Sequence, residues 1–388
     1  MKNNIKLFFA GDFCSKPSAS KIIVSDELRS LIQSCDLKVV NFEVPLKPDI
    51  QLPSQERERF YQHDDVPNFL RSLGFNLFSQ ANNHAFDWED EGFKKTKAAL
   101  GDAAFGAGTY EEAYKVKVVE VRGVKIGFLA VCHAAYKGVF DDVTKHEGLG
   151  CAYIYDLKVN HVIMEAKKLV DYLFILPHDG IEYIDIPMPE TVARYRDFID
   201  YGADGVIAAH PHCPQGWEEY KGKPIFYSLG NFLFNSKEGY DYRAWNRPHW
   251  YEGLCIILSI DTSNNRISFE TVNTRNVDNL NIVIDHTLER NLHNVQLCRY
   301  LSNKEEYNDC FKKQMGKIVR EEYLPKMNMT FHYSTFKQMI KALVRYAWNK
   351  MRNKGDESVK QMLKHDTMRY SLLRCMGQKE SSYLKSLM

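Results

Sequence analysis

The feature that most constrains this chain is a regular alternation of short apolar runs and helical stretches over its first 230 residues. Such alternation is typical of β-α-β units, which build a largely parallel or mixed sheet. The carboxyl ends of strands in an α/β sheet meet at one rim, so polar residues that follow the strands are expected to lie together. Five runs end in this way: residues 5–10 before Gly11 and Asp12, residues 37–41 before Glu43, residues 76–80 before Asn82, Asn83 and His84, residues 172–177 before His178, and residues 205–209 before His210 and His212.

Further elements follow from helix and strand signals. A helix is expected where acidic residues open a segment and basic residues follow, and a strand where an apolar run is bounded by turn residues. Residues 254–261 and 267–272 are expected to pair through a turn at residues 262–265 and, with residues 224–228, to complete a second sheet. The expected helices are residues 88–100 and residues 189–201.

The last quarter of the chain is expected to form a basic, mainly helical extension. Residues 291–388 hold 19 Lys and Arg against 9 Asp and Glu, whereas residues 1–290 hold 32 against 41. Residues 335–350 place apolar side chains on one helical face. The extension either docks on the acidic body, which is the favoured interpretation, or provides a peripheral membrane or protein contact. The predicted domains are residues 1–275 and residues 276–388.

Composition excludes several classes of protein. A content of 44% hydrophobic and 26% charged residues is that of a globular chain. The nine cysteines are spread singly, which argues against a disulfide framework or a thiolate zinc site and favours a reducing compartment. No run approaches the ~18 apolar residues of a membrane helix, and the first run is too short for a signal peptide, so a cytoplasmic location is expected. The acidic body and the lack of a nucleic-acid-binding motif exclude nucleic acid as a partner.

The polar strand ends offer ligands for divalent metal ions. His210 and His212 flank a proline just after an apolar run, so both imidazoles can reach one cation. Asp12 and Glu43 add the anionic oxygens that a dication needs, and Asn83 adds an amide oxygen. The structural alternatives are surface histidines and helix or turn caps. Mixed carboxylate, amide and imidazole ligation favours manganese, zinc or iron, and leaves calcium and magnesium open.

His84 is the candidate general acid, because it is held at a tight turn after an apolar run. Asp87 either orients His84 or caps the helix that follows; the cap is the favoured interpretation, and Asp87 is kept beside His84 as a catalytic candidate. Two cations in such a cleft would activate water and stabilise charge on the attacking and leaving oxygens. Cys14 and Cys213 lack the paired spacing of a thiolate site and are interpreted as bystanders.

The motifs together resemble one known family over about residues 5–235. Their order and spacing are similar to those of the capsule-synthesis CapA domain, also called the poly-gamma-glutamate capsule domain, which belongs to the metallophosphoesterase-like superfamily. Such a linked set is far more specific than any one motif. The motifs that carry the resemblance are residues 11–12, 41–43, 81–87, 106–108, 178–183, 202–212 and 227–232.

The resemblance implies a calcineurin-like fold, a four-layer α/β/β/α sandwich in which two mixed sheets stack with helices outside. His84 would serve as the acid, together with Asp87 as the second catalytic candidate. The metal ligands would be Asp12, Glu43, Asn83, His178, His210 and His212. The residues assigned to substrate binding are Asn82, Asp179, Glu182, Ser228 and Asn231.

Three positions depart from the family pattern. Cys14 stands where phosphoesterases have the histidine of an Asp-x-His motif, and Lys16 is the nearest base where the family has an arginine. Asp179 replaces a common tryptophan and could add a carboxylate ligand. Many family members carry a membrane anchor, whereas this sequence starts directly with the first predicted strand.

The leading hypothesis is a metal-dependent hydrolase that cleaves a phosphoester, amide or ester bond of a polymer or a small molecule in bacterial capsule or surface-polymer biosynthesis. One alternative on the same fold is a peptide epimerase, which would abstract an α-proton with a carboxylate or an imidazole. Another is a non-catalytic capsule assembly factor that uses the cleft only for binding. The hydrolase is favoured because a purely structural protein has little use for so many costly polar groups in one cleft.

Overall fold

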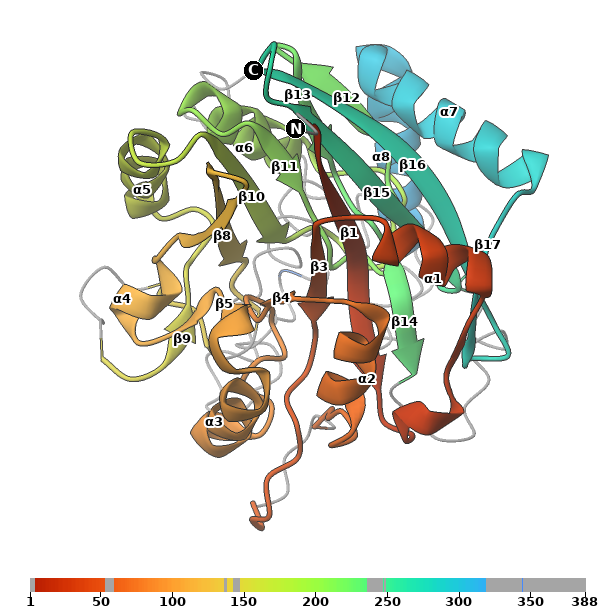
Figure 1. Ribbon diagram of the computed structural model, residues 1–388. Coiled ribbons are helices and arrows are strands. Elements are labelled where there is room, and N and C mark those ends of the chain that lie inside the picture. Colours follow the sequence, from red (N-terminus) through yellow and green to blue (C-terminus); the bar gives the residue numbers. More distant parts are fainter. Residues whose placement is uncertain are drawn as a thin grey trace.

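The computed structural model describes residues 4–52, 59–135, 138–141, 147–235, 247, 249–318 and 344. Two large sheets dominate it and stack face to face, with helices on their outer faces (Figure 1). The predicted amphipathic helix at residues 335–350 lies outside the described residues, apart from residue 344.

The first sheet has nine strands and contains the N-terminal strand β1 at its centre. β1 pairs in parallel with β3 and β14 and antiparallel with β15. The members of the sheet are β2 (Ile23–Val24), β17 (Asn281–Ile284), β16 (Arg266–Val277), β15 (Glu252–Asp261), β1 (Asn4–Ser15), β3 (Leu37–Phe42), β4 (Leu77–Ser79) and β5 (Ala104–Phe105), with β14 (Asn231–Asn235) beside β1.

The second sheet has six strands, of which β10 and β11 deliver histidines to the site described below. β8, β10, β11 and β13 run parallel to one another, and β12 and β7 add antiparallel edges. In order they are β12 (Trp217–Tyr220), β13 (Lys223–Phe226), β11 (Gly205–Ile207), β10 (Tyr172–His178), β8 (Val124–Cys132) and β7 (Lys117–Val121); β6 (Ala107–Gly108) and β9 (Gly150–Cys151) form a separate small sheet.

Helices cover both outer faces. α1 and α2 pack on the first sheet through one apolar cluster, and α5 and α6 pack on the second sheet through another. The helices are α1 (Asp26–Gln33), α2 (Val66–Leu73), α3 (Glu89–Leu100), α4 (Tyr110–Ala113), α5 (Leu157–Lys167), α6 (Pro189–Asp200), α7 (Leu288–Ser302) and α8 (Lys304–Ile318), with 3-10 turns η1 (Ala19–Lys21) and η2 (Gly101–Ala103). The predicted α/β/β/α sandwich is therefore confirmed.

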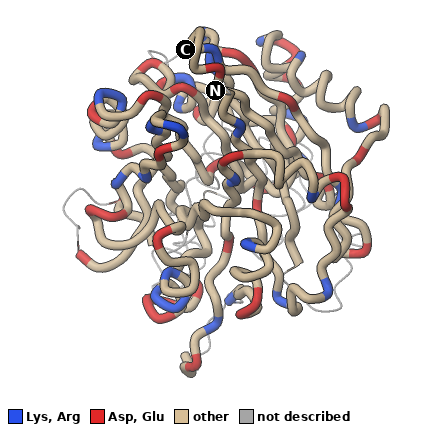
Figure 2. The backbone as a smooth tube through the Cα atoms, in the orientation of Figure 1, with Lys and Arg blue, Asp and Glu red and all other residues tan. Residues whose placement is uncertain are grey.

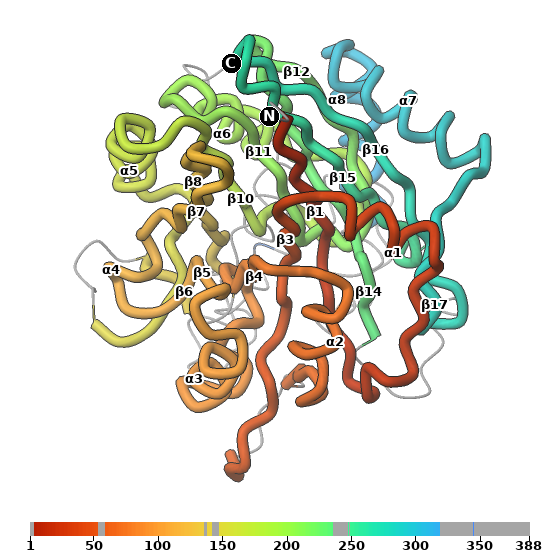
Figure 3. The backbone as a smooth tube through the Cα atoms, in the orientation of Figure 1, coloured from red at the N-terminus to blue at the C-terminus, as the bar shows by residue number. Residues whose placement is uncertain are grey.

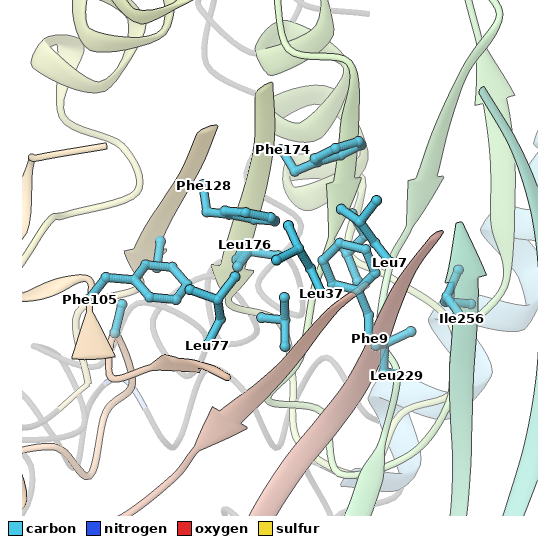
Figure 4. Close-up of a cluster of buried hydrophobic side chains, with 14 of the residues drawn as sticks. Leu7, Phe9, Leu37, Leu77, Phe105, Phe128, Phe174, Leu176, Leu229 and Ile256 are labelled. Atoms are coloured by element: carbon cyan, nitrogen blue, oxygen red, sulfur yellow. The ribbon is translucent and has the colours of Figure 1, made fainter. Parts of the chain in front are cut away.

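The main core lies between the two sheets. Leu7 and Phe9 of β1 face it, whereas Phe8 points to the helices outside, because successive side chains of a strand alternate between its faces. Phe9 meets Phe174 of the opposite sheet with ring centroids 6.0 Å apart, and Figure 4 shows both among the buried side chains between the sheets. With both faces of β1 buried, its sequence is a continuous apolar run rather than an alternating one.

The pairing of residues 254–272 corrects the sequence prediction. β15 and β16 form the expected hairpin around residues 262–265, but they extend the first sheet and not the second. Figure 3 shows them, in green to teal, beside the dark red β1. The physical reason is that β15 is apolar on both faces: Leu254 and Leu258 face the inter-sheet core, and Ile257 faces the outer one. Such a strand is stable between two neighbouring strands in the interior of a sheet.

The chain after β17 packs back on the domain. Phe311 and Met315 of α8 are buried against Ile184 and Ile186 of the loop between β10 and α6. α3 and α5 carry charges of both signs, as Figure 2 shows. Among the described residues, none of the helices has both the length and the apolar character that are needed to span a bilayer. Strand pairing continues beyond residue 275 to Ile284, and the division into two domains remains a prediction.

Candidate metal centre

Asp12 is aimed at the site by an irregularity in β1. The register of β1 shifts on either side of Asp12, against β3 and against β14. Such a bulge redirects a side chain. Gly11 is needed just before it, because a Cβ atom at this position would lie 1.9 Å from the carbonyl oxygen of Gly230. The Asp12 amide donates to that same oxygen over 3.0 Å. The close approach explains why glycine precedes the aspartate.

The other predicted ligands come from neighbouring strand ends, as the sequence indicated. Glu43 follows β3, Asn83 lies in the turn after β4, and His178 is the last residue of β10. His210 and His212 follow β11. All are buried. The six residues that form this principal centre are Asp12, Glu43, Asn83, His178, His210 and His212.

His178 links the ligands from the two sheets. Its Nε2 lies 2.8 Å from Asn83 Oδ1 and 3.1 Å from His210 Nδ1. Its ring nitrogens are each 3.8 Å from a carboxylate oxygen, Nδ1 from Asp12 and Nε2 from Glu43. His212 contacts the same two carboxylates, with ring nitrogens 3.4 Å from Asp12 and 3.8 Å from Glu43. The geometry therefore brings the predicted ligands to one point.

His210 and His212 have unusual backbone conformations. Their φ angles are 107° and 56°, in a region that residues other than glycine rarely adopt. The segment is held by its neighbours: the His210 amide donates to Asp12 Oδ2 over 3.1 Å, and the Tyr183 amide donates to the Pro211 carbonyl over 2.8 Å. Backbone strain of this kind persists where the surroundings enforce it, often at functional sites. Here it places both imidazoles beside the carboxylates.

The electrostatics of the principal centre favour a bound cation. Burial and the charge of Asp12 raise the pKa of Glu43 well above its usual range. Burial alone would raise the pKa of Asp12 as well, but His212 and His178 lower it on balance. Burial holds the pKa of His178 well below that of a free imidazole. Burial would lower the pKa of His212, but the contact with Asp12 raises it on balance, so the two carboxylates already favour positive charge beside them, which a bound cation would supply.

Two buried acceptor atoms lack a partner that a metal ion or its bound water would provide. Among the described residues, Glu43 Oε1 and Asn41 Oδ1 have no hydrogen-bond partner. The ligand atoms of Asp12, Glu43 and His178 lie within 4.8 Å of one another, and so do those of Glu182, His210 and His212. Carboxylate, amide and imidazole groups at this spacing suit a divalent transition metal ion. The residues present therefore fit divalent cations, and their identity remains a prediction.

His84 and Asp87 form a buried pair beside this centre. His84 Nδ1 lies 2.9 Å from Asp87 Oδ2, which also accepts the Phe60 amide over 3.0 Å. α3 begins at Glu89 behind Trp88, without a side-chain cap. The favoured interpretation of Asp87 as a helix cap is therefore wrong. Its carboxylate is used to orient an imidazole, which explains why a negative side chain is buried here.

Four of the five residues assigned to substrate binding make hydrogen bonds within the protein, and one of them, Asn231, contacts a predicted ligand. Asn231 Oδ1 lies 2.9 Å from His212 Nδ1 and thereby orients that ring. Asn82 donates to the Phe42 carbonyl over 3.1 Å and accepts from the His84 amide over 3.2 Å. Asp179 accepts from Thr191 Oγ1 over 2.9 Å, and Ser228 donates to the Cys213 carbonyl over 2.8 Å. Their role in substrate binding remains a prediction.

Glu182, the fifth of these residues, lies with His210 and His212 in a group of closely spaced ligand atoms.

Cys14 and Cys213 are buried, and burial raises the pKa of each thiol well above its usual range. Thiols of this kind are inert, in agreement with their interpretation as bystanders. Lys16 lies over the ring of Tyr61, 5.1 Å from its centroid.

Sequence reasoning missed two residues of the site. His133 is fully buried, with Nδ1 2.9 Å from the His178 carbonyl and its ring 4.3 Å from that of His210. It follows β8 directly, so the strand-end rule would have found it. Asn41 Nδ2 lies 2.7 Å from Asp12 Oδ1 and 3.2 Å from His178 Nδ1. It is the last but one residue of β3 and was counted only as part of a motif.

Known proteins with a similar sequence share the region of this site. A family model described as bacterial capsule synthesis protein PGA_cap matches residues 6–236. The PGA biosynthesis protein CapA of Bacillus subtilis is 29% identical over 211 residues, which are 53% of this chain and 55% of that protein. The capsule biosynthesis protein CapA of Bacillus anthracis is 28% identical over 214 residues, 53% of this chain and 52% of that protein. The chain spans about half the length of these curated relatives.

Two solved structures are similar at lower identity. A hypothetical protein from Thermus thermophilus is 17% identical, with a TM-score of 0.44 over 69% of this chain and 99% of that one. A protein described as a novel phosphatase from Mycoplasma pneumoniae is 16% identical, with a TM-score of 0.43 over 70% of this chain and 94% of that one. The family model, which matches more than half of the residues, identifies the chain as a member of the bacterial capsule synthesis PGA_cap family.

Proposed function

We propose that this chain is a metal-dependent hydrolase that cleaves a phosphoester, amide or ester bond in the biosynthesis of a capsule or surface polymer. The observation that carries the proposal is the convergence of two ligand groups from both sheets, linked where His178 Nε2 lies 3.1 Å from His210 Nδ1. Neighbouring groups of this kind can hold two cations. The two groups are Asp12, Glu43 and His178, and Glu182, His210 and His212.

The principal centre would hold the cations, and bound metal would supply a water molecule with a lowered pKa. Asn41 and Asn231 fix the orientation of the ligands, since they contact Asp12 and His212 respectively. Outer partners of this kind tune a metal site. The two buried carboxylates would balance the cationic charge.

His84 would deliver the proton that the leaving group needs. Asp87 Oδ2 lies 2.9 Å from Nδ1 of this imidazole, so the carboxylate holds the Nδ1 proton and leaves Nε2 as the atom that passes a proton to the leaving oxygen or nitrogen. Phe60 packs its ring edge against the imidazole, with centroids 5.1 Å apart, and limits its rotation. A fixed tautomer and ring orientation are what a general acid requires.

The names of the two Bacillus relatives refer to PGA and capsule biosynthesis. The substrate we propose is accordingly a capsule polymer or one of its small precursors. Poly-gamma-glutamate, whose backbone is joined by amide bonds, is the polymer that the family description suggests. Within the described part of the chain, the candidate centre for the reaction is the principal centre, where ligand groups from both sheets meet.

The test compares the metal content and the turnover of two forms of the purified chain. We expect the native protein to hold manganese, zinc or iron in stoichiometric amount and to hydrolyse a chromogenic phosphoester in the presence of manganese. The His210→Ala, His212→Ala double variant should lose the turnover and the metal held by the principal centre. His161→Ala is the matched control, because this histidine lies on α5, apart from the ligands.

Other outcomes would favour the alternative functions. Stoichiometric metal without turnover of phosphoesters, amides or esters would contradict a hydrolase and favour an assembly factor. Exchange of a peptide α-proton with solvent deuterium after removal of the metal would favour an epimerase. A native protein that binds no metal would overturn the proposal.

A further inference from the structure

A second group of metal-binding side chains lies outside the principal centre. Asp185 belongs to the loop between β10 and α6, His249 precedes β15, and His293 lies on α7. Their ligand atoms are within 4.8 Å of one another. Asp185 Oδ2 lies 3.0 Å from His293 Nε2 and 3.6 Å from His249 Nε2. These three residues are called the histidine-pair cluster below.

The separations in this cluster are those of a coordination shell. A tetrahedral zinc ion with ligand bonds of about 2.0–2.1 Å holds neighbouring ligand atoms about 3.3 Å apart. The two oxygen-to-nitrogen distances, 3.0 and 3.6 Å, lie on either side of that value. His293 Nε2 is close to the carboxylate, yet it makes no hydrogen bond within the described part of the chain. Positive charge between the two atoms, carried by a metal ion or by a proton, would stabilise this contact.

Side chains around the cluster hold its ligands in place, as the outer partners of a metal site do. His249 Nδ1 lies 2.8 Å from Glu252 Oε2, so this ring keeps its proton at Nδ1 and turns the lone pair of Nε2 toward Asp185. Gln314 of α8 donates to Asp185 Oδ1 over 2.5 Å, which leaves Oδ2 for the imidazoles. Arg290 forms an ion pair with Glu252 and keeps that carboxylate ionised. A lone pair that faces a carboxylate oxygen is stabilised by positive charge between the two atoms, which a metal ion or a second proton supplies.

We propose that Asp185, His249 and His293 bind one divalent transition metal ion, zinc above all, at a site separate from the principal centre. Two imidazoles and one carboxylate are a ligand set that zinc accepts, with water in the fourth position. The ion would join three chain segments that lie far apart in the sequence and would fasten α7 to the domain.

The same ion would stabilise the loop that serves the principal centre. Glu182, which lies beside His210 and His212, is three residues before Asp185 in this loop. On the other side, Trp250 follows His249 and packs its ring against that of His212, with centroids 5.0 Å apart. Occupation of the cluster therefore fixes two segments that contact the principal ligands.

The test uses the full chain after removal of metal by a chelator. Zinc is added back to a His178→Ala, His210→Ala, His212→Ala variant, in which both ligand groups of the principal centre are disabled, and bound metal is measured after equilibrium dialysis. We expect this variant to retain one equivalent of zinc and to lose it when His293→Gln is added. Cobalt in place of zinc should give a visible absorption band that the same substitution removes.

Thermal unfolding provides a second measurement that does not depend on activity. Saturating zinc should raise the Tm of the variant with a disabled principal centre by about 5 °C, and His293→Gln should abolish the rise. His286→Gln is the matched control, because this exposed histidine lies just before α7 and pairs with Glu27 instead. It should leave both zinc binding and the Tm shift unchanged.

Two results would overturn the proposal. One is that the variant with a disabled principal centre binds no zinc at pH 8, where free imidazoles are neutral. The other is a Tm that changes with pH and not with zinc, since a shared proton would then bridge the histidines and Asp185. Because the principal centre is disabled throughout, failure of the proposed hydrolase function would leave the outcome of this test unaffected.

Discussion

The principal centre and the histidine-pair cluster share one loop but are built in different ways. The ligands of the principal centre are buried and stand at the carboxyl ends of strands of both sheets. The cluster is partly exposed, with about 28% of the His293 side chain accessible, and its ligands come from two loops and a helix. Strands of a packed sheet fix their ends rigidly, whereas the cluster depends on how α7 docks. We therefore expect the first site to perform chemistry and the second to stabilise structure.

The largest expected effect separates chemistry from metal binding. His84→Gln should lower kcat by about 10²- to 10⁴-fold, because it removes the proton donor, and should leave the metal content of both sites unchanged. The measurement is turnover of the chromogenic ester together with metal analysis. His63→Gln is the matched control, since His63 forms a similar pair with Asp65 at 2.7 Å but on the surface. Loss of metal in His84→Gln would show that His84 is a ligand and not an acid.

The next effect concerns stability and belongs to the cluster. Glu252→Gln should lower the free energy of unfolding of the metal-free protein by about 3 kcal/mol at neutral pH, because Arg290 is left buried without its partner. Glu91→Gln, at an exposed pair with Lys94, should change it by less than about 0.5 kcal/mol. Chemical denaturation in the presence of a chelator measures both. A large loss of metal from the principal centre in Glu252→Gln would break the distinction between the sites.

The pH dependence of that effect has a defined sign. Burial would raise the pKa of Glu252, but the hydrogen bond with His249 and the charge of Arg290 outweigh it, so the folded pKa lies below the usual value. The stabilisation is therefore present above the unfolded pKa of about 4.3 and is lost as the pH falls through the folded pKa. Glu252→Gln should reduce the acid sensitivity of unfolding. If Glu252→Gln left the loss of stability at low pH unchanged, the result would contradict the ion pair.

The smallest expected effect tests the outer partners of the principal centre. Asn41→Ala removes the amide that contacts Asp12 Oδ1 and His178 Nδ1, and should weaken metal binding there by about 10- to 100-fold. Equilibrium dialysis against manganese measures the affinity. Asn264→Ala, in the exposed turn between β15 and β16, is the control and should have no effect. Zinc binding at the cluster should be the same in both variants, and a parallel loss at both sites would indicate general unfolding.

Much of the principal centre was predictable because its ligands follow local signals. Asp12, Glu43 and His178 each follow an apolar run, and that rule needs no knowledge of the strand order. The same rule applied to β8 would have added His133. Asp87 was misassigned because a carboxylate just before a helix usually caps it, and only the three-dimensional structure shows the contact with His84. The cluster gave no signal, since isolated histidines in loops and helices carry none.

The sequence by itself determined the α/β class, the two helices at residues 88–100 and 189–201, the hairpin around residues 262–265, and which strand ends carry the polar side chains that meet in the principal centre. These depend on periodicity, caps and turns, which are properties of neighbouring residues. Only the tertiary structure decided that β15 and β16 extend the first sheet, and that Asp185, His249 and His293 meet. The pairing of strands and the docking of helices depend on which buried faces fit together across long sequence separations, and no local pattern records that choice.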